Sequence, residues 1–344
     1  MKKKSKIVFF ILGIIFTVIL SLVIYVNVKY KHIDSEIRMM GFLINKFVEF
    51  DDIDSLKKLK DNRLSLPHIM SDEVVLDEVF IDTVNGKIKV FIMKSKDYNY
   101  TSNKQVGLLW LHGGGYALKS PKDELFAMER FVLENNSVVI APEYTLSVDE
   151  PYPRAINDCY DTLLWMKENA DKLGIRENQL FVGGTSAGGG LTASLTLMAR
   201  DKGEVNIAFA MPLYPMINQY TISDDDKNFI WDKRRNKIAW ELYLGKGYDP
   251  ESVSKYAAAL MEDDFSNLPP MYTFIGNQDS FYEDTLEYVN RLKKDNVVVN
   301  YEVYKGGFHA FEYTCTFCNM SVTAWDKLLD HYDYASKNYF AEQK

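Results

Sequence analysis

The chain of 344 residues is poor in cysteine, glycine and proline, and each shortage excludes a class of protein. Three cysteines make no disulfide framework, and 19 glycines with 10 prolines are too few for a collagen-like or low-complexity chain. No internal repeat of about 20–50 residues is present, which disfavours a solenoid or a propeller. With 47% hydrophobic and 26% charged residues, the composition indicates a globular protein with a sizeable core.

Outside the N-terminus, acidic residues outnumber basic ones. The chain carries a net charge of −8, and residues 1–32 contain six lysines and no acidic residue. The other 312 residues, with 34 basic and 48 acidic side chains, therefore carry −14. An acidic body repels phosphate backbones, and no basic stripe interleaved with aromatic residues occurs. We expect no nucleic acid among the partners.

The few cysteines leave one structural question open. Cys315 and Cys318 form a single Cys-x-x-Cys pair, and Cys159 stands alone. One such pair without a second is a poor zinc site. The pair is compatible with a local disulfide in an oxidising compartment and equally with two unpaired thiols.

Charged residues are missing altogether from Ile7 to Val28, a run of 22 residues. A helix of that length measures about 33 Å, close to the thickness of a bilayer's hydrocarbon core. A secretory signal peptide has an apolar region of only about 7–15 residues and a small-residue cleavage site, which this run lacks. We interpret residues 1–32 as a basic tail and an uncleaved transmembrane anchor. Because four lysines lie within the first six residues, the positive-inside rule predicts a cytoplasmic N-terminus and an extracytoplasmic body.

No linker rich in proline, glycine or serine divides the rest of the chain. Residues 33–73 have amphipathic helical spacing and are expected to form N-terminal cap helices. Residues 74–344 alternate between strand-like and helix-like stretches, which predicts an α/β fold with a mostly parallel sheet covered by helices on both faces. Residues 216–262 interrupt this rhythm with an acidic patch at Asp224–Asp226 and several aromatics, and we expect an inserted helical cap there. The strand-like runs are 74–84, 87–95, 105–114, 137–144, 179–184, 207–215, 271–279 and 297–306.

A candidate nucleophile follows one of these strand-like runs, in Gly184-Thr185-Ser186-Ala187-Gly188. A serine on a sharp strand-to-helix turn exposes its hydroxyl, and small neighbours let adjacent backbone pass closely. The start of the following helix also favours developing negative charge. A Gly-x-Ser-x-Gly pattern alone is weak evidence for a nucleophile, since an ordinary glycine-rich strand-to-helix turn can have the same sequence. The assignment of Ser186 therefore depends on its context.

That context includes the run His112-Gly113-Gly114-Gly115 at the end of another strand. Consecutive glycines let backbone N–H groups converge on one point, as the stabilisation of a tetrahedral oxyanion requires. The alternatives are a flexible structural loop and a phosphate-binding loop, but neither known glycine-rich phosphate motif continues here. His112 is expected to order this loop rather than act as a base.

A base and an acid are predicted from their positions at strand ends. His309 lies on a loop just after the strand-like run 297–306, at the sheet edge where catalytic groups gather in open α/β sheets. It is the candidate general base for Ser186. Asp279 ends the run 271–279 and is preferred as the acid over Asp284, which lies about a turn into the next helix. The remaining histidines are expected in loops or on the surface: His32, His68 and His331.

With these residues in place, residues 74–340 resemble the hormone-sensitive-lipase-like esterases of the α/β-hydrolase fold. The similarity lies in LHGGGY, in the stretch from Tyr144 to Asp158, in GTSAGGG, in the approach from Asp263 to Asp279, and in GFHAF. It implies that Ser186 is the nucleophile, Asp279 the acid and His309 the base. It also implies an oxyanion hole formed by Gly113, Gly114 and the N–H of Ala187, and no metal or organic cofactor.

The chain departs from the family pattern at two places. Ala310 replaces the usual glycine after the histidine, and Ser147-Val148-Asp149 replaces Ala-Pro-Glu. Neither change removes a reacting group, although the second is expected to alter how the loop below the site is braced. An N-terminal anchor before such a body is similar to the layout of arylacetamide-deacetylase-like enzymes.

The leading hypothesis is a membrane-anchored serine carboxylesterase or deacetylase that cleaves short acyl esters through an acyl-enzyme intermediate. A catalytically inactive receptor or binding protein on the same scaffold is the alternative. A peptidase or acyltransferase with the same triad is a third, because fold does not define reaction. The natural substrate, the oligomeric state and cleavage of the N-terminal segment remain open.

Overall fold

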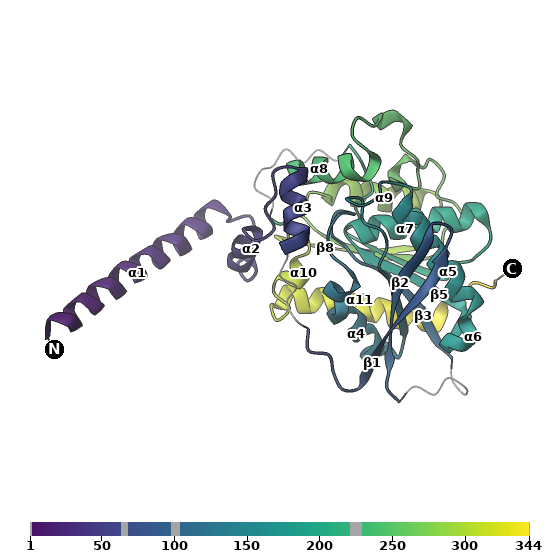
Figure 1. Ribbon diagram of the computed structural model, residues 1–344, viewed down its shortest axis with the longest axis horizontal. Coiled ribbons are helices and arrows are strands. Elements are labelled where there is room, and N and C mark those ends of the chain that lie inside the picture. Colours follow the sequence, from purple (N-terminus) through teal and green to yellow (C-terminus); the bar gives the residue numbers. More distant parts are fainter. Residues whose placement is uncertain (1, 63–67, 98–103, 221–228, 344) are drawn as a thin grey trace.

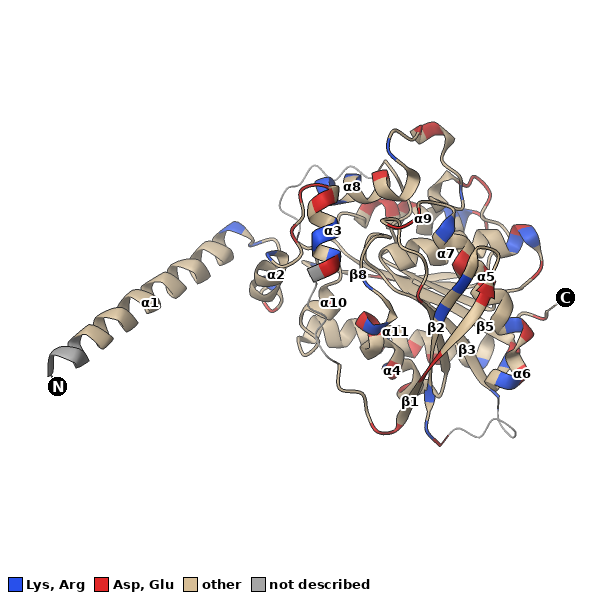
Figure 2. Ribbon diagram, viewed as in Figure 1, with Lys and Arg blue, Asp and Glu red and all other residues tan. Residues whose placement is uncertain are grey.

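The computed structural model describes residues 2–62, 68–97, 104–220 and 229–343. A long helix, α1 (Lys2–Lys29), projects from a body that holds all the other elements (Figure 1). Its segment Ile7–Lys29 is long and apolar enough to cross a membrane, and none of that segment's most apolar stretch is buried against the body. Figure 2 shows charges of both signs spread over the body, whereas α1 carries none between residues 7 and 28. The acidic patch predicted at Asp224–Asp226 lies outside the described residues.

The core of the body is a sheet of eight strands in the order β1-β2-β4-β3-β5-β6-β7-β8. β2 runs antiparallel to β1 and β4, and the other neighbours are parallel. The strands are β1 (Val74–Thr83), β2 (Gly86–Ser95), β3 (Gln105–Leu111), β4 (Val138–Pro142), β5 (Ile175–Thr185), β6 (Phe209–Leu213), β7 (Met271–Gly276) and β8 (Val299–Tyr304). Each strand overlaps one predicted run, which confirms the mostly parallel α/β architecture.

Helices cover both faces of the sheet, as predicted. On one face α4 and α11 pack together through edge-to-face rings of Phe126 and Trp325. On the other face α7 and α9 share a buried cluster that includes Leu197 and Leu292, and α5 packs beside α7. These helices are α4 (Leu125–Asn135), α5 (Arg154–Glu168), α6 (Ala170–Leu173), α7 (Ala187–Lys202), α9 (Tyr282–Lys294), α10 (Phe311–Thr314) and α11 (Asn319–Asn338).

Two segments outside this α/β core meet each other at one end of the body (Figure 1). The first contains α2 (Arg38–Asn45) and α3 (Ile53–Asn62), and the second contains α8 (Lys233–Leu244) between β6 and β7. The Asn45 side-chain oxygen accepts hydrogen bonds from the Ile230 N–H and from Arg235, both at 2.9 Å. One α2 side chain therefore ties the two segments together.

The Cys315–Cys318 pair is a disulfide, which answers the question that the sequence left open. It closes the short loop between α10 and α11. Cys159 is a buried free thiol in α5. The pairing brings no distant parts of the chain together, so its effect is confined to the loop that follows His309.

Candidate active site

The turn that carries Ser186 forms because glycine stands on both sides of it. Ser186 follows β5 and precedes α7 directly, with a backbone φ of 54°. A Cβ atom on Gly184 would lie 2.4 Å from the carbonyl oxygen of Leu111, and one on Gly188 would lie 2.0 Å from the same oxygen. Any larger residue at either position would push β3 away from the turn. The small neighbours predicted from the sequence are therefore a steric requirement of this fold.

Ser186, His309 and Asp279 form one hydrogen-bonded chain. His309 Nε2 lies 2.8 Å from Ser186 Oγ, and His309 Nδ1 lies 2.8 Å from Asp279 Oδ2. The three residues come from the carboxyl ends of β5, β8 and β7, and all three are buried. The second oxygen of Asp279 accepts the Phe281 N–H at 2.9 Å, which holds the carboxyl group in place. Asp284, the rejected alternative, instead accepts a hydrogen bond from Asn218.

A buried acid lies behind this chain. The Tyr214 ring stands edge-on to the His309 imidazole at 5.2 Å, and its hydroxyl donates to the carboxyl group of Glu312 in α10. Burial raises the pKa of Glu312 to about 8. The sequence did not single out this residue, because nothing local distinguishes it from a surface glutamate.

The glycine loop departs from the prediction at its first glycine. The Gly113 N–H donates to Glu124 Oε1 at 2.9 Å, in the interior, instead of facing the serine. Gly113 was expected to contribute to the oxyanion hole, whereas in this structure its only backbone donor engages the Glu124 carboxyl group. The N–H groups of Gly114 and Ala187 donate to no acceptor within the described part of the chain.

Glu124 joins three parts of the site. It ends the 3₁₀ turn η1 (Pro121–Glu124) and is fully buried. Its Oε1 accepts both the Gly113 N–H and the Thr185 hydroxyl, the latter at 2.8 Å, and its Oε2 accepts Trp110 Nε1–H at 2.8 Å. One carboxyl group thus holds the glycine loop against the residue that precedes Ser186. Sequence reasoning missed it, because no local pattern reports that Glu124 reaches residues as distant in the chain as Thr185.

His112 orders the glycine loop, as predicted. Its ring stacks on Tyr144 at 4.1 Å, and Nδ1 lies 2.8 Å from the carbonyl oxygen of Gly113. The Tyr144 hydroxyl donates to the His112 carbonyl oxygen at 2.8 Å. Burial lowers the pKa of His112 to about 4, so the ring is neutral at physiological pH. Its role is to pack against Tyr144 and hold the glycine loop.

Comparison with known proteins agrees with this geometry. Residues 108–313, more than half of the chain, match the family described as alpha/beta hydrolase fold. The chain belongs to the hormone-sensitive-lipase-like family of α/β-hydrolases. It is therefore a member of a serine-hydrolase family.

The proteins similar to this chain are named as hydrolases or as esterases. An AB hydrolase superfamily protein of Schizosaccharomyces pombe is 28% identical over 214 residues, which is 58% of this chain and 62% of that protein. An arylesterase of Saccharolobus solfataricus is 25% identical over 244 residues, 66% of this chain and 77% of the relative. Among solved structures, a bacterial heroin esterase superposes with a TM-score of 0.82 at 26% identity, covering 89% of this chain and 99% of that one. The chain thus spans somewhat less than two thirds of the fission yeast relative but nearly all of the heroin esterase.

One aromatic side chain, Trp231, lies against both the glycine loop and the candidate base. A Cβ atom on Gly115 would lie 2.3 Å from the Trp231 ring, and the ring centroid is 6.1 Å from that of His309. Trp231 therefore extends from the glycine loop to the base. Its carbonyl oxygen accepts the Ser280 hydroxyl at 2.7 Å, which fastens it beside Asp279. Among the aromatics of the predicted cap segment 216–262, Phe229, Trp231 and Trp240 are buried.

Both departures from the family pattern have local explanations. Ala310 has a φ of 56°, a left-handed conformation that glycine adopts at lower cost, so the family's glycine preference has a backbone cause. Asp149 forms an ion pair with Lys60 of α3 at 2.9 Å. The substituted loop is thus braced by the N-terminal segment of the chain.

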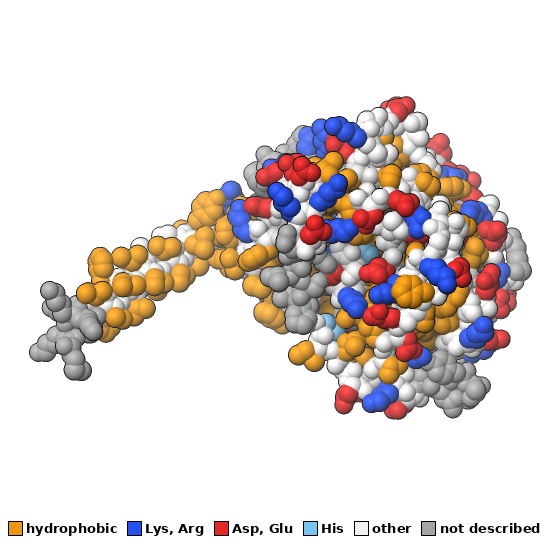
Figure 3. Space-filling model, viewed as in Figure 1, with side chains coloured by type: hydrophobic (Ala, Val, Ile, Leu, Met, Phe, Trp, Pro, Cys, Tyr) orange, Lys and Arg blue, Asp and Glu red, His pale blue; other side chains and the backbone are white. Residues whose placement is uncertain are grey.

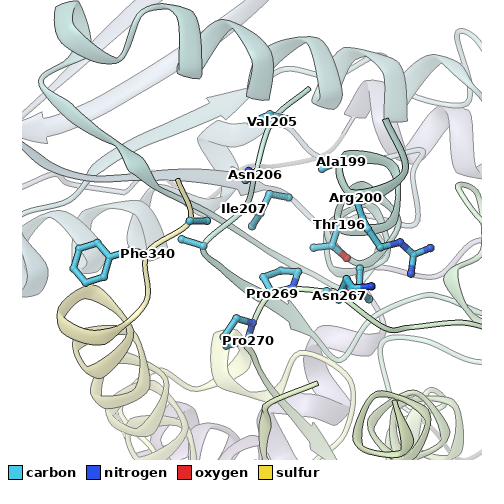
Figure 4. A pocket seen from close by; sticks show the side chains of 13 residues that line it. Thr196, Ala199, Arg200, Val205, Asn206, Ile207, Asn267, Pro269, Pro270 and Phe340 are labelled. Atoms are coloured by element: carbon cyan, nitrogen blue, oxygen red, sulfur yellow. The ribbon is translucent and has the colours of Figure 1, made fainter. Parts of the chain in front are cut away.

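A separate cavity of about 260 Å³ lies on the opposite edge of the sheet. Its lining includes Ile207 before β6, Pro269 and Pro270 before β7, the end of α7, and Phe340 after α11 (Figure 4). The hydrogen-bonded chain of Ser186 lies at the carboxyl ends of these parallel strands. This cavity therefore does not belong to the candidate active site.

Proposed function

We propose that the protein is a membrane-anchored serine carboxylesterase or deacetylase that hydrolyses short acyl esters. The observation that carries this proposal is the continuous hydrogen-bonded chain from Asp279 through His309 to Ser186. The esterase names of its relatives support the choice of an ester substrate. No metal or organic cofactor enters the proposed reaction.

The geometry suits acyl transfer in two steps. Ser186 Oγ attacks the ester carbonyl carbon while His309 Nε2 takes the hydroxyl proton, and the bond to the alcohol then breaks as His309 returns that proton to the leaving oxygen. Water next attacks the acyl-enzyme, with His309 accepting its proton and then passing it to Ser186 Oγ as the acid leaves. Asp279 accepts a hydrogen bond from the Nδ1–H of His309, which keeps Nε2 free to act as the base.

The oxyanion is proposed to bind the N–H groups of Gly114 and Ala187. Ala187 begins α7, and the first N–H groups of a helix have no acceptor within it. One such donor typically contributes about 10²–10³ in rate. Gly113 is assigned to the support of this loop, because its N–H is donated to Glu124.

The position of Trp231 favours a substrate with a short acyl group. Trp231 contacts the glycine loop and its ring centroid lies 6.1 Å from that of the base, so it is proposed to limit the space available to the acyl group. Residues 33–73 and 216–262 are proposed as the cap, over a catalytic domain of residues 74–344.

The membrane placement is proposed from α1. Its apolar segment of 23 residues is long enough to span a bilayer. The N-terminus is proposed to be cytoplasmic and the catalytic domain extracytoplasmic. The Cys315–Cys318 disulfide supports an oxidising location for the body.

Ser186→Ala tests the enzymatic proposal. Removal of the nucleophile should lower turnover of a short-chain aryl ester by several orders of magnitude while the thermal unfolding midpoint stays near that of the wild type. Near-full activity in that variant would refute the assignment. A folded wild type without activity on any ester would favour the inactive binding protein, and transfer of the acyl group to an alcohol or amine in place of water would favour an acyltransferase.

A further inference from the structure

The last turn of α1 is fastened to the body. Val26 is fully buried, and Arg38 of α2 donates to the side-chain oxygen of Asn27 at 2.7 Å. The Tyr30 ring packs against Phe229 with centroids 4.5 Å apart. Because these contacts begin within the last turn of the helix, no free linker separates α1 from the body. The orientation of the body relative to the α1 axis is thereby set.

Apolar side chains are exposed beside that turn. We call them the juxtamembrane patch: Met40, Leu43, Phe47 and Phe317. Phe47 is 77% exposed and Phe317 is 80% exposed, although both are large and apolar. Figure 3 shows apolar side chains continuing from α1 onto the adjoining end of the body. Single exposed apolar residues are ordinary, but a cluster next to an apolar helix indicates an interaction surface.

The part of the patch contributed by the C-terminal region is held against α2. The Glu36 carboxyl group, just before α2, accepts the N–H of Asn319 at 2.9 Å and its side-chain amide at 2.7 Å. The Cys315–Cys318 disulfide closes the loop that carries Phe317. Phe317 is therefore presented by a braced loop at the same end of the body as α2 (Figure 1).

We propose that the juxtamembrane patch inserts into the interfacial layer of the lipid bilayer that α1 spans, so that the body rests on the membrane. This inference depends on the proposed membrane span of α1. Lipid is the occupant because apolar side chains continue from α1 onto the adjoining end of the body (Figure 3), beside the helix end where Lys29 and Lys31 follow the apolar run. Amphipathic elements at this depth bury their apolar side chains among headgroups and upper acyl chains.

Photo-crosslinking of the full-length protein in vesicles of a single phosphatidylcholine tests this proposal. p-Benzoylphenylalanine replaces one exposed phenylalanine at a time: Phe16 in α1, Phe47 and Phe317 in the patch, and Phe340 near the C-terminus as the matched control. All four side chains are exposed, so folding should be retained, and turnover of a soluble aryl ester verifies it. After illumination, intact mass reports an increase equal to one lipid.

The proposal predicts lipid adducts at Phe16, Phe47 and Phe317 and none at Phe340. Adducts at Phe16 without adducts at Phe47 and Phe317 would overturn the docking and leave the membrane span intact. No adduct at Phe16 would refute the span itself, and the docking with it. Crosslinks from Phe317 to a second copy of the chain would also overturn the docking and identify the patch as an interface between copies.

Discussion

Glu124→Gln is the substitution that tests most closely how this active site is held together. The side chain keeps its size but exchanges one acceptor oxygen for an NH₂ group. In the native structure the two carboxyl oxygens accept hydrogen bonds from Gly113, Thr185 and Trp110, Lys119 Nζ lies 3.5 Å from Oε1, and the carboxyl group donates to none of them. In either orientation of the amide, NH₂ must face at least one of these donors.

The size of the effect follows from those contacts. Loss of one or two hydrogen bonds to a buried carboxyl group should lower the free energy of unfolding by about 2–4 kcal/mol. Gly113 directly precedes Gly114, so loosening Gly113 displaces a proposed oxyanion donor. Complete loss of such a donor costs about 10²–10³ in rate, and we expect a displaced one to cost about 10–100-fold in kcat. KM should change little, because the donor acts mainly in the transition state.

Steady-state kinetics on a short aryl ester, together with thermal unfolding, measure both effects. Glu129→Gln is the matched control, since Glu129 is a buried glutamate in α4 that contacts His68 and the Ser71 N–H and no part of the glycine loop. The control should lose stability without a comparable loss of kcat. If Glu124→Gln keeps its kcat, or if both variants lose kcat equally, Glu124 does not position the oxyanion loop.

Three further predictions concern the surroundings of the site. Trp231→Ala should enlarge the space available to the acyl group and raise kcat/KM for longer acyl chains relative to acetyl by about tenfold, and an unchanged chain-length profile on a series of aryl esters would contradict the proposed role of Trp231. Glu312 has a pKa of about 8 in the folded protein and an ordinary value of 4.5, so the native state keeps a proton that the unfolded state loses between these values, and stability should fall as pH rises from 4.5 to 8. Glu312→Gln should flatten that part of the stability profile in unfolding measurements at pH 5 and pH 8, and an equal slope in both proteins would contradict the assignment. Ala310→Gly should stabilise the protein by up to about 1 kcal/mol, because φ at this position is positive, and a lower unfolding midpoint would show that no strain is relieved.

The sequence predicted those parts of the molecule that depend on local pattern. Apolar runs of the right length located all eight strands, and position at a strand's carboxyl end distinguished Asp279 from Asp284. A sharp turn and a strand-end loop each leave a recognisable signature, which made Ser186 and His309 candidates, and the structure places their side chains 2.8 Å apart. These features need no knowledge of distant contacts.

The rest depends on contacts between residues far apart in the chain. Glu124 and Thr185 are 61 positions apart, and no local pattern reports that their side chains meet. The same carboxyl group also accepts the Gly113 N–H, a contact between residues 11 positions apart that the glycine run alone does not reveal. Trp231 could be read only as a cap aromatic until its contacts with Gly115 and His309 were known. The Cys315–Cys318 pairing stayed open because it depends on redox environment as well as on spacing.

Labelling with a fluorophosphonate probe tests the central claim most directly, because the probe reacts covalently with a serine only when its hydroxyl is activated. Wild-type protein and Ser186→Ala are treated in parallel, and mass spectrometry locates the adduct. We predict a single adduct on Ser186 that is absent from the variant. Folded wild-type protein that takes up no probe, or that carries it on another residue, would contradict the proposal that Ser186, His309 and Asp279 form a working catalytic triad.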